Sequence, residues 1–186
     1  MMDYMGKTFE FDIRARGDFD DRLPKAGIRT TTTDIQEGGI YEENGAKVTA
    51  FLVDHGPVKP AFGYRVDYAG RSVAMSGDTR FSENLIKHSQ AVDLLIHESG
   101  GNFPPNPNQT ERERAQQEKI KALHTPADQT AVVFNRVQPR LAVYAHFGSP
   151  AVLAEARKTY SGPLEIGEDL MTIEIGDQIR VARRGK

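Results

Sequence analysis

The sequence predicts a mixed α/β fold, of α+β character, in which a β-meander is followed by alternating strands and helices. Two turn signals, Asn44-Gly45 and Ala69-Gly70, lie between runs rich in β-branched and aromatic residues. Asn44-Gly45 is expected to join two strands in a tight hairpin. The strands that these signals predict from residue 47 onward are 47–53, 61–68 and 72–76.

The second half of the chain predicts helices between short buried strands. Thr125 suits an N-cap and Pro126 the first helical position, and Ser149-Pro150 repeats this start signal. The predicted helices are 81–90, 125–137 and one that opens at 149. The predicted strands are 92–97, 141–145, 171–175 and 179–182.

Other segments predict peripheral structure. Residues 1–25 mix charged and aromatic residues without a clean helical or strand period, and the Thr-rich run 29–34 has high β propensity. A Pro/Asn/Gly-rich loop at 100–109 precedes a charged stretch, 111–121, which is expected to be a solvated helix or a lid.

Composition limits the classes of function. With 186 residues, 38% hydrophobic and 27% charged, the chain is expected to be one globular domain, 1–186. It contains no apolar run near the roughly 18 residues that span a bilayer, and its first residues lack the apolar core of a signal peptide. A cytoplasmic protein is expected. The formal net charge of −2 gives no general attraction to nucleic acid.

Cysteine is absent, so imidazole and carboxylate must hold any metal, and this donor set suits zinc, manganese or iron. Asp78 follows an apolar strand-like run, and its small neighbours Ser76, Gly77 and Thr79 allow a sharp turn that presents the carboxylate. A carboxylate in this place can bridge two ions. The alternative is that Asp78 caps the helix that starts near Phe81.

Three histidines lie at the ends of apolar runs or near a helix start: His55, His124 and His146. A single histidine at a strand end is more often a surface or core residue than a ligand. Glu98 could orient His124 for general acid catalysis, and the alternative for this pair is a buried salt bridge. His97 should point to the opposite face of its strand from Glu98 and is expected to be structural. His88, among polar residues, is expected to be solvated.

Taken in order, these motifs resemble the second half of the metallo-β-lactamase superfamily, in its ribonuclease Z-like branch. The resemblance runs over about 38–160. It is carried by the Ser-Gly-Asp-Thr-Arg run at 76–80 and by the segment from His55-Gly to the Ala-Phe-Gly-Tyr-Arg run at 61–65. It implies an αββα sandwich, of which this chain holds the second half and part of the first.

The resemblance also implies the roles of the site residues. His55 would serve a first divalent metal, most simply zinc, His146 a second, and Asp78 both. Thr79-Arg80 would support the aspartate. His124, oriented by Glu98, would contact the scissile phosphate or protonate the leaving group.

The His-x-His-x-Asp-His cluster of this family is missing. The metal site is therefore expected to be incomplete and the chain alone inactive. Either the chain is truncated or another polypeptide supplies the missing half, and truncation is favoured because Met1 falls where the first half should be ending. The exposed sheet surface would then favour a homo-oligomer.

Only 22 residues separate His55 from Asp78, where tRNA-processing ribonuclease Z carries an arm that grips tRNA. A small phosphodiester or ester is therefore expected as the substrate, without membrane binding and with nucleic acid less favoured. Two alternatives remain, a non-catalytic half-fold that pairs with itself or a partner, and a tRNA 3′ endonuclease whose arm comes from elsewhere. The segment 100–123 joins Glu98 to His124 and could cover the site.

Overall fold

The structure, a computed structural model, describes residues 7–19, 32–100, 106–146 and 148–183. The chain divides into two compact units, 1–35 and 36–186. In the first unit, helix α2 (Glu10–Phe19) carries an ion pair at i, i+4 spacing, in which Arg14 Nη2 lies 2.8 Å from Glu10 Oε1. Of the Thr-rich run, residues 29–31 lie outside the described residues and 32–34 form no strand.

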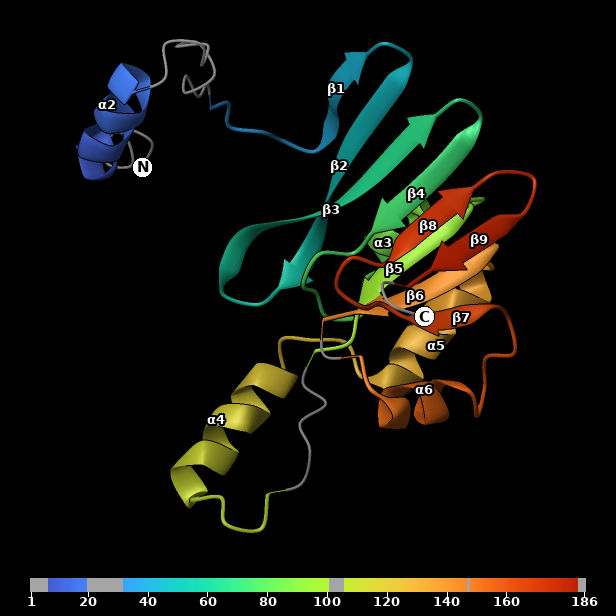
Figure 1. The fold of residues 1–186 in the computed structure, drawn as a ribbon. Helices are drawn as coiled ribbons and strands as arrows, with labels where there is room; N and C mark the ends of the chain where they lie inside the picture. The colour runs from blue at the N-terminus through green and yellow to red at the C-terminus, as the bar shows by residue number, and fades with distance from the viewer. Residues whose placement is uncertain (1–6, 20–31, 101–105, 147, 184–186) are drawn as a thin grey trace. The chain divides into compact units, whose positions relative to one another are not determined.

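The second unit contains a seven-stranded sheet whose spatial order follows the chain (Figure 1). Its strands are β1 (Gly38–Glu43), β2 (Ala46–His55), β3 (Val58–Tyr68), β4 (Arg71–Met75), β5 (Leu94–Glu98), β6 (Leu141–Ala145) and β7 (Leu164–Ile166). Strands β1 to β4 pair antiparallel, and β4 to β7 pair parallel. The predicted meander and the β-α-β alternation after it are therefore confirmed, whereas β7 was not predicted.

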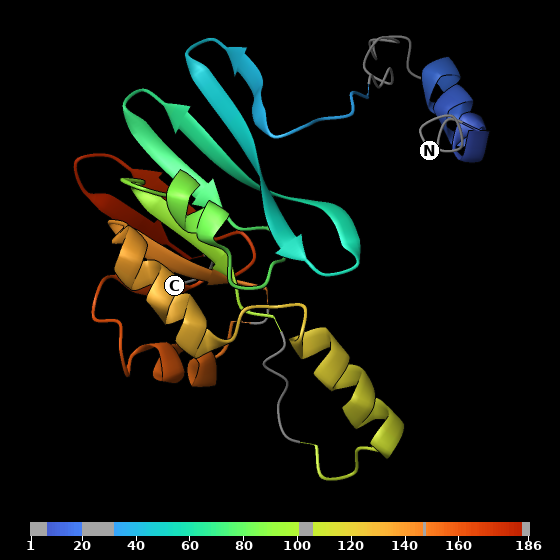
Figure 2. The same cartoon turned by 180° about the vertical axis from the view of Figure 1, so that it is seen from behind.

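Helices cover one face of the sheet, as seen in Figure 2. They are α3 (Glu83–His88), α5 (Ala127–Val137) and α6 (Pro150–Ala156). The core beneath them includes Phe51, Leu95, Phe134 and Tyr144, all 0% exposed. These side chains explain the apolar spacing of the helices, because each helix has to bury one stripe against the sheet.

A two-stranded hairpin, β8 (Thr172–Ile175) and β9 (Ile179–Ala182), packs on the other face of the sheet (Figure 1). Leu94, Leu141 and Val143 form the buried layer between them. The hairpin reaches β4 through Val73 but not the full meander. Both of its strands were predicted.

Among the described residues of the second unit, no helix or strand covers the rest of this face, over β1 to β4. Met75 lies on the same side of β4 as Val73, and it pairs with Tyr64 on β3. The cross-strand register places four exposed apolar side chains on this side: Tyr41 (47%), Leu52 (44%), Tyr68 (57%) and Met75 (37%). We call these four residues the open face.

Three local predictions were wrong in detail. The helix predicted over 81–90 is α3, which spans only Glu83–His88. It begins later because the Ser82 side chain accepts the Leu85 N–H and caps the helix there. Helix α5 has Pro126 as its N-cap, and Thr125 instead donates its hydroxyl to the Thr79 carbonyl. His88 is half-buried and stacks on Phe51 with ring centroids 4.8 Å apart, because α3 lies against β2.

Helix α4 (Glu111–Lys121) confirms the predicted solvated helix. Thr110 caps it, with its side chain accepting the Glu113 N–H while Glu113 bonds back to the Thr110 N–H. No residue of α4 is buried, and the helix lies away from the sheet in Figures 1 and 2. The part of the expected lid at 101–105 lies outside the described residues.

Candidate metal centre

The candidate residues gather at one edge of the sheet. β2 and β4 run in the same direction, as do β5 and β6, so the carboxyl ends of all four strands meet there. His55 ends β2, Asp78 follows β4, Glu98 ends β5 and His146 follows β6. His124 reaches the same edge from the segment between α4 and α5.

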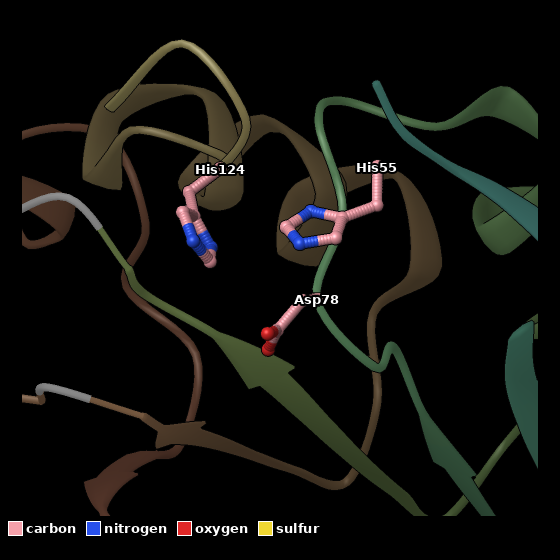
Figure 3. A group of neighbouring side chains, drawn as sticks. All are labelled: His55, Asp78 and His124. Atoms are coloured by element: carbon pink, nitrogen blue, oxygen red, sulfur yellow. The ribbon is translucent and has the colours of Figure 1, made fainter. Parts of the chain in front are cut away.

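Three side chains converge closely enough to share one cation: His55, Asp78 and His124 (Figure 3). One ligand atom from each lies within 4.8 Å of the others. Asp78 is exposed, His55 half-buried and His124 buried. Two imidazoles and a carboxylate suit zinc and other borderline divalent metals, and the site offers no soft thiolate.

Glu98 orients His124. The His124 Nδ1 lies 3.0 Å from Glu98 Oε2, and both side chains are nearly inaccessible to solvent. The same carboxylate accepts the N–H of Gly100 and, at 2.7 Å on its other oxygen, the N–H of Thr125. A Cβ at position 100 would collide with the His124 ring, so glycine is required there.

The hydrogen bonds assign the same tautomer to both histidines of the cluster. Because Glu98 accepts from His124 Nδ1, that nitrogen carries the proton, and in the neutral imidazole Nε2 then keeps its lone pair. His55 Nδ1 lies 3.0 Å from the carbonyl oxygen of Leu123 and must donate to it. Nε2 of His55 is therefore also a lone-pair donor, which is the form that binds metal.

The turn after β4 positions Asp78. Gly77 has φ +60° and lies against the Phe62 carbonyl, where a Cβ would collide. The Ser76 hydroxyl accepts the Glu98 N–H at 2.9 Å and donates to the Gly77 carbonyl at 2.7 Å. This ties the ends of β4 and β5 together. Asp78 is not the cap of α3, because Ser82 is, so that alternative is wrong.

His146 lies beside the cluster. Its ring centroid is 5.4 Å from that of His124, and its side chain is exposed. The backbone of His146 has φ +51°, which is unusual for a residue other than glycine. The Ser99 hydroxyl holds this conformation through the carbonyls of Ala145, at 3.0 Å, and His146, at 2.8 Å.

The structure thus brings together all five residues that the sequence singled out, but in a different grouping. His124, expected to be a proton donor, is the third member of the close cluster, and His146 stacks on the His124 ring without belonging to the cluster. The sequence did not indicate the role of Ser99. Its position directly after the end of β5, a strand parallel to β6, was the available signal.

His97 is buried in the core, as its strand position predicted. Its ring meets Phe134 edge-on at 6.0 Å between centroids, and Nδ1 lies 2.7 Å from the Glu98 carbonyl oxygen. Burial lowers the pKa of His97, so the neutral imidazole is favoured.

A family model described as a beta-lactamase superfamily domain matches residues 7–147. The chain belongs to the metallo-β-lactamase superfamily. A ribonuclease Z from Myxococcus xanthus is 33% identical over 139 residues, which cover 72% of this chain and 41% of the relative. The chain thus spans less than half of that protein, and it spans 54% of a ribonuclease Z from Mycobacterium avium.

Solved structures confirm the fold. The metallo-beta-lactamase fold protein YhfI from Bacillus subtilis superposes with a TM-score of 0.55 at 18% identity, covering 77% of this chain and 52% of that protein. The short form of human tRNase Z gives 0.50 at 21% identity, covering 74% and 46%. The predicted resemblance to ribonuclease Z-like proteins and the predicted metallo-β-lactamase fold are confirmed over part of the relatives' length. Superfamily membership implies a divalent metal, and the His/Asp cluster fits one.

Proposed function

We propose that this chain carries one part of the active site of a metal-dependent hydrolase that cleaves a phosphodiester or an ester. The observation that supports this most strongly is the convergence of His55, Asp78 and His124 at the carboxyl edge of the sheet. Both imidazoles present Nε2 lone pairs, and the carboxylate completes a facing set of donors. When bound, a divalent cation supplies Lewis acidity for hydrolysis.

In this proposal, Asp78 and His55 hold zinc, and His146 would bind a second metal ion beside it. His124 has two candidate roles, because its Nε2 can bind the metal or carry a proton to the leaving group. The geometry favours the ligand role, since its ring belongs to the close cluster. Glu98 serves either role by fixing the ring and its tautomer.

The substrate we propose is a small phosphodiester or ester. Residues between His55 and Asp78 form only β3, β4 and their turns, so the described structure holds no projecting arm in that interval. The relatives named ribonuclease Z support tRNA 3′ maturation as a second candidate. Binding of a tRNA at low salt, weakening as salt rises, would support that candidate.

Elemental analysis of the purified chain, paired with its mass in solution, tests the proposal. At least one zinc per chain, together with hydrolysis of bis(p-nitrophenyl) phosphate, supports a catalytic centre assembled by this chain or by its oligomer. Metal-free protein that stays metal-free after dialysis against zinc would contradict it. The cytoplasmic location stays a prediction of the sequence. Among the described helices, none is long and apolar enough to cross a membrane.

A non-catalytic half-fold that self-associates is the other candidate, and the open face favours it. Tyr41, Leu52, Tyr68 and Met75 expose large apolar surface on one side of the meander. Apolar patches of this kind mark interaction surfaces. We propose a homo-oligomer through this face, which is compatible with catalysis if the partner copy completes the site.

A further inference from the structure

Several hydrogen bonds hold the segment that carries His124. One of them comes from Arg80, and the proposed function gives this bond no role. Arg80 Nε donates to the Ala122 carbonyl at 2.7 Å, two residues before His124. His55 Nδ1 donates to the next carbonyl, that of Leu123. These bonds matter because α4, which leads into the segment, has no buried residue to hold it.

Arg80 is itself anchored to the end of β2. Its backbone N–H donates to the Asp54 carbonyl at 2.7 Å, and its guanidinium lies 3.5 Å from the Asp54 carboxylate. The N–H of Gly56, and then Arg80, hold the pKa of Asp54 below its usual value, so this carboxylate stays charged. Asp54 is adjacent to His55. The guanidinium therefore joins the strand end that carries one histidine to the segment that carries the other.

Thr79, the residue before Arg80, contacts the chain on the C-terminal side of His124. The Thr79 carbonyl accepts the Thr125 hydroxyl at 2.7 Å, and the Thr79 hydroxyl lies 3.3 Å from the Asp54 carbonyl. Residues 79 and 80 directly follow Asp78 in the chain. The two residues after the aspartate thus contact positions 122 and 125, on either side of His124.

We propose that Arg80 is a positioning residue that sets the distance of His124 from Asp78 and His55. This inference rests on the proposed metal centre and adds to it a residue that touches none of the ligand atoms. Lysine cannot replace the guanidinium fully, because one ammonium has no planar fork with which to reach Ala122 and Asp54 together.

The test compares Arg80→Ala and Arg80→Lys with Arg136→Ala. Arg136 is a suitable control because it is also a partly exposed arginine in an ion pair, with Glu83 at 2.7 Å, but on α5. For each protein we would titrate Co²⁺ by its visible spectrum, measure the melting temperature, and follow trypsin cleavage after Lys121 by mass spectrometry.

The expected result for Arg80→Ala is weaker Co²⁺ binding by about 10–100-fold, the usual effect of losing a residue that supports a ligand. Cleavage after Lys121 should become faster, and the melting temperature should stay close to that of Arg136→Ala. Arg80→Lys should give an intermediate affinity. Millimolar guanidinium added to Arg80→Ala should restore part of the Co²⁺ spectrum.

Two results would overturn the inference. One is unchanged Co²⁺ affinity in Arg80→Ala, whether or not cleavage accelerates. The other is an affinity loss that tracks the melting temperature and that neither Arg80→Lys nor guanidinium repairs. If the unaltered chain binds no Co²⁺, the proposed metal centre fails, and an unchanged cleavage rate after Lys121 in Arg80→Ala would then reject the Arg80 contact separately.

Discussion

His55 and His124 meet edge to plane, with ring centroids 5.1 Å apart and ring planes at 65°. Each ring donates from Nδ1 to a fixed oxygen, the Leu123 carbonyl for His55 and the Glu98 carboxylate for His124. Because these donors are used away from the cluster, Nε2 of each ring is left to bind a cation shared with Asp78, which lies beside both rings (Figure 3). The site is organised by its outer hydrogen bonds before any ligand arrives.

Replacing Asp78 by alanine should remove the carboxylate on which the metal centre depends. We expect the metal content of Asp78→Ala to fall to background and any hydrolysis of bis(p-nitrophenyl) phosphate to disappear, in this chain and in any longer form. Asp34→Ala is the control, because Asp34 is also exposed and lies in the other unit. Normal metal content and activity in Asp78→Ala would show that the centre is elsewhere.

Glu98→Gln should uncouple His124 from its support while keeping the shape of the side chain. The carboxylate accepts three N–H donors, and a glutamine, whose amide carries one oxygen and an NH₂ group, leaves at least one donor without a partner. We expect a loss of about 1–3 kcal/mol in the free energy of unfolding and weaker Co²⁺ binding. Glu118→Gln on exposed α4 is the control. Equal denaturant midpoints for the two variants would contradict this prediction.

The open face should determine the oligomeric state of the protein in solution. Leu52→Glu places a charge in the apolar patch, so we expect it to convert an oligomer to a monomer in sedimentation or light-scattering measurements. Val132→Glu is the control, because Val132 is equally exposed, at 44%, but lies on α5. A monomeric unaltered chain, or an oligomer that survives Leu52→Glu, would reject association through this face.

His97 should make the fold less stable in mild acid. Its pKa is lowered by burial in the folded state, so the unfolded chain binds a proton first as the pH falls. The contribution is complete above the unfolded pKa of about 6.5 and is lost as the pH drops toward the lower folded pKa. The check is the free energy of unfolding measured against pH with a metal chelator in the buffer. Below the unfolded pKa of histidine, this free energy should fall less steeply for His97→Asn than for the unaltered chain. His88→Asn should keep the steep profile.

Local sequence patterns were sufficient to predict turns and helix starts that depend only on neighbouring residues. Asn44-Gly45 forms the turn that its residue types favour, Ala69-Gly70 forms the predicted turn with both residues at positive φ, and Ser149 caps α6 as expected. Thr125 shows where this reasoning stops. Its side chain had a local partner available as an N-cap, but the Thr79 carbonyl, 46 residues away, takes the hydroxyl instead.

The amino-acid sequence by itself predicted the order of the strands and helices apart from α2 and β7, the superfamily and five candidate site residues, because periodicity, turn residues and motif order are local properties of the chain. The grouping of those five residues was decided only by the tertiary structure. Glu98 meets His124 across 26 residues and His55 meets Leu123 across 68, and no local pattern specifies such contacts. Parallel strands bring their carboxyl ends to one edge, and buried hydrogen bonds then select which rings face each other.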